Sequence, residues 1–566
     1  MCYAGSSPVQ EAARVVASIA RFPGAGAAVR REDQERELVE VCSRVVEACV
    51  RASPPGDAFL EAALSDTLYH EGLRLERAGD DPASRAWREL YAHVRRELVG
   101  ASGPRRRALL GEIVRRYAEE VLGNFDERVY RVATRVVPHG LSLLLKGLSL
   151  RRLATLDVLS RGLADHVEVE GEVEHARALL DRGTLLVVPT HSSNLDSIVL
   201  GYAVYLLGIP PLTYGAGINL FANPLLAFFM HNLGAYKVDR TKKAELYKQV
   251  LKEYQTCALE MGYHSLFFPG GTRSRSGEVE RHLKKGLLGT GLTAYQNNLA
   301  AGRPNPDVFI VPCTLNYKLV LEAETLIEDH LKEAGKARFI ITDDEFSQPR
   351  KVLTFMSNLL SLDSRIAVRF GRPLDVFGNP VDREGRSLDP HGRPVDRRGY
   401  VQRDGQPVRD AQRDQQYTQE LADAIAATWL RDNVLMSTHL VAFALTRLLE
   451  RQNPGMDRYR LLRTGGASES FGMAELHAEL DALLAALRAH PAGPALDGLV
   501  AAGDVPEIAA DAFKHFGIYH ARAAAHRQGD RVFHGDRNLL LFYGNRLRGY
   551  DLGRRLAVGE GSTWNG

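Results

Sequence analysis

Apolar and charged positions follow a helical period through the first part of the chain. Apolar side chains recur at helical spacing, with charged side chains between them, in four stretches: Ala12–Ile19, Leu38–Val50, Leu60–Leu75 and Trp87–Leu98. This spacing gathers the apolar side chains on one face of a helix, where they pack against a neighbour. The pattern therefore predicts an N-terminal helical domain over residues 1–160.

The period of the pattern changes after residue 160. Short runs rich in β-branched residues, separated by helical stretches, then follow: Thr184–Thr190, Ser265–Phe268, Val308–Pro312 and Arg365–Phe370. Alternation of strand-like and helix-like segments is typical of an α/β fold. We expect an α/β domain over residues 161–373, with a mixed sheet flanked by helices and active residues on the loops after strand ends.

Two further regions complete the expected organisation. Residues 374–412 are rich in Asp, Arg, Gly and Pro, with turn residues that recur about every eight positions. Because such a segment cannot bury a core, we expect an exposed hairpin array or a flexible loop. Helical spacing returns in Leu421–Arg431, Leu440–Glu450 and Met473–Arg488, which predicts a helical C-terminal region over residues 413–566.

Two stretches bear on membrane association. Ser197–Tyr236 contains no Asp, Glu, Lys or Arg, but glycines, prolines and asparagines interrupt it. A spanning helix needs about 20 predominantly apolar residues, so buried elements around a site, or a surface that dips into one leaflet, are favoured over a span. Val129–Leu159 is either a solvated helix or a basic amphipathic helix on an anionic lipid surface. Arg14, Arg21 and Arg30 interrupt any apolar core of a secretion signal.

Composition narrows the classes of function. The 566 residues are 45% apolar and 25% charged, the balance of a folded protein of two or three domains. Lys plus Arg total 72 against 70 Asp plus Glu, and a net charge so close to zero does not favour nucleic-acid binding. The five cysteines form no CxxC pair and no HExxH motif occurs. We therefore expect a reducing cytoplasm, and neither a disulfide framework nor a metal site.

The first candidate site follows directly on the strand-like run TLLVVPT. The motif HSSNLD begins at His191 and ends at Asp196, a spacing that turns the two side chains apart on a regular helix. With His191 on a loop and Asp196 in the first turn of the next helix, they can meet. Asp196 then fixes the imidazole tautomer, and His191 can take a proton from a hydroxyl. The same spacing recurs from His391 to Asp396 without a strand before it, so spacing alone is not specific.

Basic groups beside glycines form the second candidate site. The segment GAYKVDR ends at Arg240, and the later segment LFFPGGTRSRSG contains Arg273 and Arg275. A strand that leads into glycines lets backbone N–H groups approach a ligand, and arginines offer paired donors to phosphate oxygens. Lys284 and Lys285 follow and would add point charges. These segments predict either a phosphate-binding site or a solvated basic loop.

Taken in order, these motifs resemble the four sequence blocks of the glycerolipid acyltransferase family, in its glycerol-3-phosphate acyltransferase branch. HSSNLD matches the HxxxxD block, GAYKVDR the second block, FPGGTRSRSG the third and VFIVPCTLNY the fourth. The order and spacing of the blocks resemble the family over residues 180–320, and a weaker likeness continues through the C-terminal helices. The spacing is nearer the glycerol-3-phosphate and dihydroxyacetone-phosphate enzymes than the short lysophosphatidate enzymes.

The chain departs from the family pattern in two places. The family usually has Glu where this chain has Gly270, and we expect no other carboxylate at that position, because Asp239 and Glu278 are near in sequence only. If that Glu holds the loop or the acceptor, the protein is expected to be slow, differently selective or inactive. The KVD triplet of the second block is also less apolar and less basic than in the family.

The resemblance implies an O-acyltransferase of phospholipid biosynthesis. It would move a fatty acyl group from acyl-CoA or acyl-ACP, as co-substrate, to a hydroxyl of glycerol 3-phosphate and give lysophosphatidate, without a cofactor or a covalent acyl-enzyme. His191 would be the general base and Asp196 its orienting partner. The implied phosphate-binding residues are Arg240, Arg273, Arg275 and Lys285. The implied substrate loop comprises Gly270, Gly271, Thr272 and Ser274.

The resemblance also implies a location and leaves alternatives open. Substrates of this kind place the enzyme on a membrane phospholipid surface, peripheral or monotopic, at the cytoplasmic face. The acceptor is alternatively lysophosphatidate or dihydroxyacetone phosphate, or the chain is a catalytically weak lipid- or acyl-CoA-binding protein on the same fold. A serine hydrolase is disfavoured because no GxSxG occurs. A nucleotide-binding protein is disfavoured because the glycines of Gly286–Gly291 precede no Lys-Ser/Thr pair.

Overall fold

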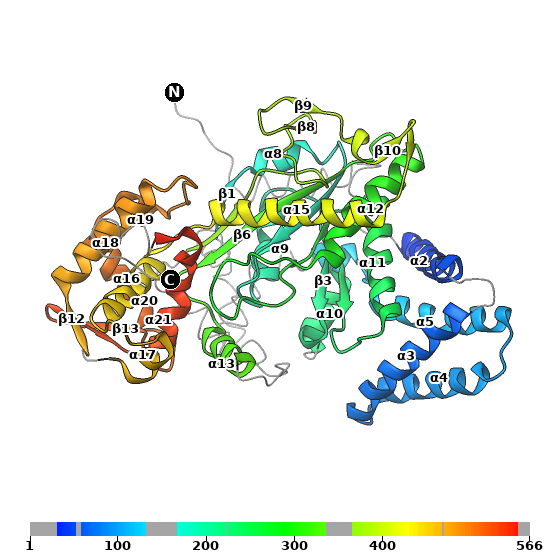
Figure 1. Cartoon of the computed structure of the whole chain (residues 1–566), viewed down its shortest axis with the longest axis horizontal. Helices are drawn as coiled ribbons and strands as arrows, with labels where there is room; N and C mark the ends of the chain where they lie inside the picture. Colours follow the sequence, from blue (N-terminus) through cyan, green and yellow to red (C-terminus); the bar gives the residue numbers. More distant parts are fainter. Residues whose placement is uncertain are drawn as a thin grey trace, which may run out of the picture.

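The computed structural model describes residues 31–52, 58–131, 167–221, 224–334, 365–466 and 469–552. The predicted helix Ala12–Ile19 and nearly all of Val129–Leu159 lie outside these ranges. Figure 1 shows a central sheet with the N-terminal helices at one end of the molecule and the C-terminal helices at the other. The predicted fold class, an α/β fold with helical regions before and after the sheet, is therefore confirmed.

Within the described residues the N-terminal part contains four helices, and three of them coincide with stretches of predicted helical spacing. They are α2 (Arg31–Ala52), α3 (Ala58–Arg77), α4 (Pro82–Leu98) and α5 (Gly103–Val121). Asp81 starts α4 because its side chain accepts hydrogen bonds from the backbone N–H groups of Ala83 and Ser84, each at 3.0 Å. Pro82 then occupies the first turn, where no N–H donor is needed.

The sheet has seven strands within the described residues. In spatial order they are β1 (Val167–Gly171), β7 (Ile366–Phe370), β6 (Val308–Tyr317), β2 (Thr184–Pro189), β5 (Ser265–Leu266), β3 (Thr213–Gly217) and β4 (Ala235–Val238). All neighbours are parallel except β6 and β7. Strands β2 and β6 are wholly buried, which explains their unbroken apolar runs, since helices cover both faces.

Helices between the strands cover the sheet. They are α8 (Val173–Ala178), α9 (Asp196–Leu206), α10 (Pro224–Asn232), α11 (Glu245–Glu260), α12 (Lys285–Ala300), α13 (Ala323–Ala334) and α15 (Ala411–Asp432). The buried indole of Trp429 on α15 donates a hydrogen bond to the carbonyl of Val188 on β2, at 3.1 Å. This bond fixes α15 against the strand that leads into the HSSNLD motif.

The uncharged stretch Ser197–Tyr236 folds into short elements. It contains most of α9, then β3, the single 3₁₀ turn η2 (Ile218–Phe221), α10 and the start of β4. Its glycines and prolines separate these elements, which agrees with buried helices and strands around a site, although Phe228 on α10 is 52% exposed. No helix in the described ranges is long and apolar enough to cross a membrane.

The Asp/Gly-rich insert forms hairpins. Strand β8 (Ser387–Leu388) pairs with β9 (Pro394–Val395), and β10 (Gln402–Arg403) pairs with β11 (Gln406–Pro407). The repeat is seven residues, not eight: Asp375, Asp382, Asp389 and Asp396 each accept a hydrogen bond from a backbone N–H two or four residues further on. These carboxylates close successive turns, so the segment is a hairpin array and not a flexible loop. The expectation that it buries no core is wrong, because Phe377, Val381 and Val401 are buried in the apolar cores.

The C-terminal region is helical as predicted, with a small sheet that its pattern did not reveal. Its helices are α16 (Ser437–Arg451), α17 (Arg458–Thr464), α18 (Met473–Arg488), α19 (Gly498–Ala502), α20 (Val505–Phe516), α21 (Arg537–Gly544) and the 3₁₀ helix η5 (Asn545–Tyr550). The sheet has the order β12 (Ser470–Gly472), β14 (Arg531–His534) and β13 (Ala525–Gln528).

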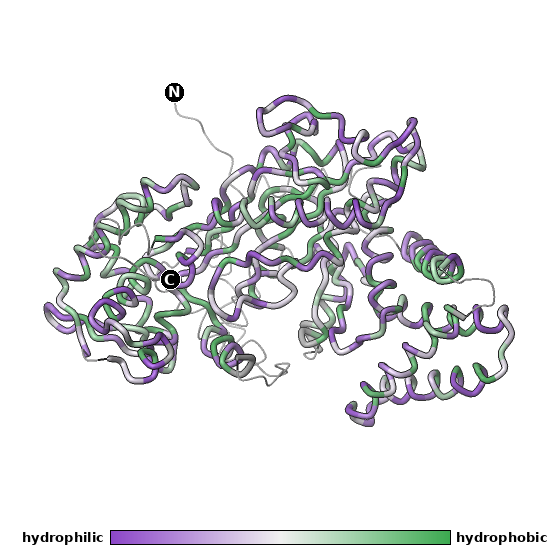
Figure 2. Tube along the Cα trace, in the orientation of Figure 1, coloured by the Kyte–Doolittle hydropathy of each residue, from purple (hydrophilic) through white to green (hydrophobic). Residues whose placement is uncertain are grey.

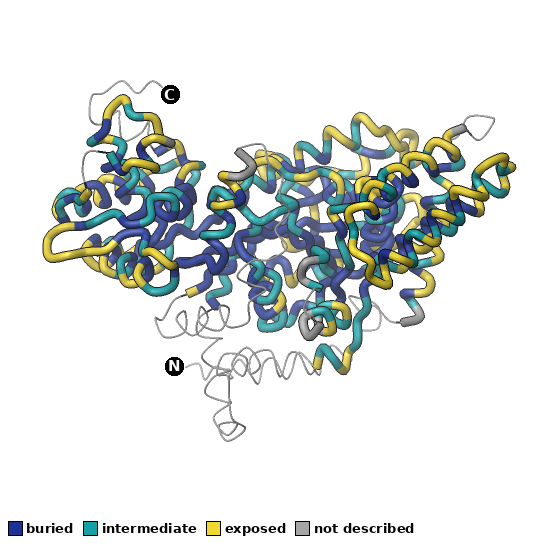
Figure 3. The backbone as a smooth tube through the Cα atoms, turned by 90° about the horizontal axis from the view of Figure 1, so that it is seen from below, coloured by how far each residue is buried: buried dark blue, intermediate teal, exposed yellow. Residues whose placement is uncertain are grey.

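Two apolar cores tie these regions together. The larger core joins the sheet to the C-terminal helices, and another joins the N-terminal helices to α11. Figure 2 shows apolar residues concentrated along the inner strands and helices, and Figure 3 shows the buried backbone continuing from the sheet into the C-terminal helices. Both helical regions therefore pack directly on the domain that carries the candidate site.

Candidate active site

The structure brings His191 and Asp196 together as the sequence predicts. Strand β2 ends at Pro189, His191 lies on the following loop, and Asp196 is the first residue of α9. The imidazole Nδ1 lies 2.8 Å from Asp196 Oδ2. Because an ionised carboxylate only accepts hydrogen bonds, Nδ1 carries the proton and Nε2 has a free lone pair. The other copy of the spacing, His391 to Asp396, lies on the exposed hairpins.

Asp196 is fully buried and receives four hydrogen bonds. Besides His191, the backbone N–H groups of Ser192 and Ser193 donate to Oδ2 at 2.6 and 2.9 Å, and the Tyr317 hydroxyl donates to Oδ1 at 2.6 Å. Burial raises the pKa of Tyr317 well above its usual value, with the Asp196 charge adding to the shift. Tyr317 therefore stays protonated, and a buried charge is tolerated because donors surround it.

The surroundings of His191 favour a neutral imidazole. Its ring stacks on Phe268, with centroids 4.0 Å apart and planes 21° apart. Burial lowers the pKa of His191 below its ordinary value, Asp196 opposes this shift, and the charges of Arg273 and Arg240 lower it further. A neutral imidazole with its Nε2 unprotonated has the protonation state that a general base needs.

Three arginines gather beside this imidazole. Arg240 follows β4, while Arg273 and Arg275 lie on the loop after β5. Desolvation and the charges of Arg273 and Arg275 lower the pKa of Arg240, so the three guanidinium groups lie within one another's electrostatic field. A bound oxyanion would offset this repulsion of like charges. Phosphate binding by these arginines stays a prediction.

Carboxylates on α13 and the turn before it hold two of the arginines. Arg273 Nη1 lies 3.5 Å from Glu322 Oε1, and Arg275 Nε lies 3.6 Å from Asp329 Oδ2. Glu322 also accepts hydrogen bonds from the Ser193 hydroxyl at 2.7 Å and the Asn194 backbone at 3.0 Å. Glu322 therefore ties the arginine loop to the HSSNLD loop.

The predicted substrate loop wraps around His191. The backbone N–H of Ser274 donates to the His191 carbonyl at 2.7 Å, and the Ser274 hydroxyl donates to the Glu278 carbonyl at 2.8 Å. Gly271 has a φ of +77°, a conformation that glycine adopts without strain. Gly270 and Thr272 flank it on the same turn, which lies directly beside the candidate base.

Of the two lysines, Lys284 has the clearer relation to the arginines. Lys284 is exposed, yet partial desolvation lowers its pKa, and the charges of Arg240, Lys243 and Arg275 lower it further. Lys285 begins α12 and is half-buried. The sequence singled out Lys285 for phosphate binding, whereas the structure brings its neighbour Lys284 into the field of the arginines.

The expectation that no carboxylate stands at the position of Gly270 is wrong. A Cβ atom added to Gly270 would lie 2.2 Å from Glu280 Oε1 and 2.4 Å from Glu280 Cδ. The Glu280 carboxylate therefore fills the space beside Gly270, although the residue stands ten positions later in the chain. No local pattern predicts this contact, because it depends on how the chain turns back after Gly277, which has a φ of +80°.

Residues from distant segments complete the site. The buried Arg546 on η5 donates from Nη2 to the Leu315 carbonyl and to Asn316 Oδ1, each at 2.9 Å. Asn545 donates to the Ser276 carbonyl at 2.8 Å. The C-terminal helices thus hold both β6 and the arginine loop in place.

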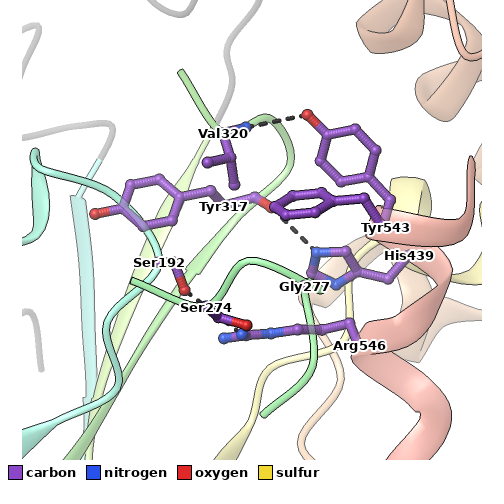
Figure 4. Close-up of a pocket in the computed structure, with 9 residues that line it drawn as sticks. Ser192, Ser274, Gly277, Tyr317, Val320, His439, Tyr543 and Arg546 are labelled. Atoms are coloured by element: carbon purple, nitrogen blue, oxygen red, sulfur yellow. Dashed lines mark hydrogen bonds between the residues drawn. The ribbon is translucent and has the colours of Figure 1, made fainter. Parts of the chain in front are cut away.

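A small cavity of about 20 Å³ lies between these segments. Figure 4 shows its lining by Ser192, Ser274, Gly277, Tyr317, Val320, His439, Tyr543 and Arg546. This volume holds about one water molecule, so the cavity is not a substrate pocket. As for metals, the part of the chain that the structure describes contains no group of three or more His, Cys, Asp or Glu side chains placed to bind an ion.

Comparisons with known proteins agree with this site. Residues 166–316 match the family model described as Acyltransferase. The glycerol-3-phosphate acyltransferase of Aeromonas hydrophila is 32% identical over 260 residues, 46% of this chain and 28% of that protein. The enzyme of the same name from Haemophilus ducreyi is 31% identical over 211 residues, 37% of this chain and 24% of that protein. The glycerol-3-phosphate acyltransferase of Haemophilus influenzae is 27% identical over 335 residues, 56% of this chain and 38% of that protein.

These alignments define how far the likeness extends. Each covers well under two thirds of the relative's own length. The crystal structure of the 1-acyl-sn-glycerophosphate acyltransferase from Thermotoga maritima aligns at 16% identity over 44% of this chain and 83% of that one, with a TM-score of 0.22, too low to support an inference. The family model covers the HSSNLD loop, Arg240 and the arginine loop. The resemblance is thus confirmed as a match of residues 166–316 to the acyltransferase family model, and the aligned relatives are named glycerol-3-phosphate acyltransferases.

Proposed function

We propose that this protein transfers a fatty acyl group from acyl-CoA or acyl-ACP to a hydroxyl of glycerol 3-phosphate, giving lysophosphatidate in phospholipid biosynthesis. The observation that carries the proposal is the neutral imidazole of His191, bonded to buried Asp196 beside three mutually repelling arginines. A base beside a cluster of cations suits a hydroxyl acceptor that carries a phosphate. The names of the aligned relatives point to glycerol 3-phosphate as that acceptor.

In the proposed reaction the phosphate binds Arg240, Arg273 and Arg275, which sets the acceptor hydroxyl near His191 Nε2. The hydroxyl oxygen attacks the thioester carbonyl as its proton passes to Nε2, and Asp196 stabilises the resulting imidazolium. The tetrahedral intermediate then collapses, the C–S bond breaks, and the leaving thiolate takes the proton from His191. A positioned base of this kind contributes about 10²–10⁴-fold to the rate.

The acyl donor and the product are both poorly soluble in water, so the proposal includes a lipid surface. The uncharged stretch Ser197–Tyr236 lies next to the site, and Phe228 on α10 is half exposed. Apolar side chains at a protein surface can enter the headgroup region of a bilayer. We therefore place the enzyme as a peripheral or monotopic protein at the cytoplasmic face of the membrane.

The test supplies purified protein with palmitoyl-CoA, in parallel with palmitoyl-ACP, and follows thiol release with each of three acceptors. Release that depends on glycerol 3-phosphate supports the proposal. Dependence on lysophosphatidate or dihydroxyacetone phosphate alone keeps the acyltransferase but replaces its acceptor. Absence of release with every acceptor, from folded protein that binds palmitoyl-CoA, contradicts catalysis and favours a lipid-binding role.

The role of the arginines is tested in the same assay. Arg240→Met is expected to raise KM for glycerol 3-phosphate about tenfold or more, because a charge-assisted hydrogen bond contributes about 1.5–3 kcal/mol. The KM for palmitoyl-CoA should change much less. Arg398→Met, on the exposed hairpins, is the matched control and should leave both values unchanged. Equal effects of Arg240→Met on both substrates would contradict a phosphate-binding role.

A further inference from the structure

Two adjacent glycines let two ionisable side chains reach the site from a later segment. A Cβ atom on Gly270 would lie 2.2–2.5 Å from the three carboxylate atoms of Glu280, and one on Gly271 would lie 2.5–2.7 Å from the end of Lys284. Real Cβ atoms do not approach other atoms so closely, so any larger residue would displace these side chains. The glycine pair is thus matched to Glu280 and Lys284.

The Glu280 carboxylate connects the candidate base to the basic cluster. Its carboxyl group lies against Gly270, on the loop whose Phe268 ring stacks on His191 and whose Ser274 N–H donates to the His191 carbonyl. Burial raises the pKa of Glu280 to about 8, while the charges of Arg546 and Lys284 oppose this rise. Its Oε2 atom is enclosed by protein. The charges of Arg240 and Arg275 lower the pKa of Lys284, and Glu280 opposes that shift. Glu280 therefore lies between the His191 loop and Lys284.

We propose that Glu280 is a positioning residue for acyl transfer, which holds the His191 loop and Lys284 in place from the space that a side chain on residue 270 would fill. This inference rests on the proposed function. It explains why the loss of an acidic residue at position 270 need not disable the site, since the carboxylate enters from position 280. Glu280 acts through the loop that packs on His191 and makes no contact with the reacting atoms in the proposed mechanism.

A glutamate on residue 270 would reach the same space. In a glutamate the carboxyl carbon lies two bonds, or about 2.5 Å, from its own Cβ, and Glu280 Cδ lies 2.4 Å from the Cβ position of residue 270. The oxygens of such a glutamate, three bonds from Cβ, would lie further out than those of Glu280, so its carboxyl group would overlap that of Glu280 without reproducing its orientation.

The experiment moves the carboxylate between the two positions. Four variants are compared with the wild type: Glu280→Ala, Glu280→Gln, Gly270→Glu, and the double variant Gly270→Glu/Glu280→Ala. Each is assayed for kcat and for KM of the acceptor and of palmitoyl-CoA, with thermal unfolding as a check on folding. Glu384→Ala, an exposed glutamate on the hairpins, is the matched control and should retain wild-type kinetics.

Glu280→Ala is expected to lower kcat by about 10–100-fold, with little change in KM for palmitoyl-CoA. Gly270→Glu alone should also lower kcat, because two carboxylates then compete for one space. The double variant should regain at least tenfold over Glu280→Ala. Glu280→Gln keeps the size and shape of the side chain and should remain more active than Glu280→Ala.

Three results overturn the proposal. A folded Glu280→Ala protein with wild-type kcat and KM shows that the carboxylate is not needed. A folded double variant no more active than Glu280→Ala shows that its position is not what matters. If Glu280→Ala does not fold, Glu280→Gln and the double variant are each compared with the wild type. An equal loss of kcat in these two folded variants would show that the position of the carboxylate is not what matters. Absence of transfer by the wild type itself refutes the proposed function, and this inference with it.

Discussion

A lysine of the acyltransferase domain is held in an aromatic cage on the N-terminal helices. Lys242 Nζ lies 4.2, 5.0 and 5.3 Å from the ring centroids of Trp87, Tyr117 and Tyr247. It also pairs with Glu120 Oε2 at 2.5 Å. Burial lowers the pKa of Lys242, and the Glu120 charge opposes that shift. The cage and the ion pair together connect α4, α5 and α11 to the loop that carries Arg240.

Replacing this lysine by methionine keeps most of the apolar stem and removes the charge. A desolvated cation–π interaction contributes about 2 kcal/mol. Breaking a buried ion pair costs about 3–5 kcal/mol, but Glu120 is 27% exposed and water will partly solvate it. We therefore expect Lys242→Met to lower the free energy of unfolding by about 2–4 kcal/mol.

The same change should weaken acceptor binding. Arg240 stands two residues before Lys242, and directly before Arg240 the backbone N–H of Asp239 donates to the Tyr247 hydroxyl at 2.8 Å at the edge of the cage. A loop that loses its anchor holds its arginine less precisely, and small misplacements of binding groups are costly. KM for glycerol 3-phosphate should therefore rise more than KM for palmitoyl-CoA.

The assay combines urea unfolding, followed by circular dichroism, with steady-state kinetics. Lys248→Met is the matched control, since Lys248 pairs with Glu245 at 3.0 Å but both side chains are at least half exposed. Such surface pairs contribute about 0–1 kcal/mol. Equal stability of the two variants would refute the reasoning about the cage. A destabilised Lys242→Met protein with unchanged KM for the acceptor would refute its link to Arg240.

Three further predictions concern His191 and Asp196. Burial, together with the charges of Arg273 and Arg240, holds the pKa of His191 below 6.5. The base therefore stays neutral to lower pH, and kcat/KM should fall only below pH 6.5. A midpoint of the kcat/KM profile above that pH would contradict the lowered pKa. Asp196→Asn removes a charge-assisted hydrogen bond of about 1.5–3 kcal/mol and should lower kcat about 10–150-fold, whereas an unchanged kcat would exclude the pair from the mechanism. Tyr317→Phe leaves Asp196 Oδ1 short of a donor and should lower the unfolding free energy by about 1–3 kcal/mol in urea titrations, with no loss expected if that oxygen is solvated.

Those parts of the fold that the sequence predicted have a strong local pattern. β2 and β6 are long buried runs of apolar residues, and α2 to α4 have regular apolar spacing. β3, with the sequence TYGAG, and β4, with AYKV, were missed. Both strands are short and lack alternation of apolar and polar residues. Their pairing with neighbouring strands defines them, and their own residues do not.

The candidate site divides in the same way. His191 and Asp196 are five residues apart, and the strand before them was enough to predict their meeting. Tyr317 and Arg546 reach this pair from β6 and from the C-terminal η5, and no local signal marks them. Glu280 was missed for another reason: a glycine in the sequence gives no information about which side chain fills the space beside it.

The central claim is that His191 takes the proton of an acceptor hydroxyl. The most direct measurement compares the wild type and His191→Ala for transfer of the palmitoyl group to isotope-labelled glycerol 3-phosphate, with product identified by mass spectrometry. The account predicts labelled lysophosphatidate from the wild type and a rate lower by about 10²–10⁴-fold in the variant, with palmitoyl-CoA binding retained. Labelled product formed at similar rates by both proteins would contradict it.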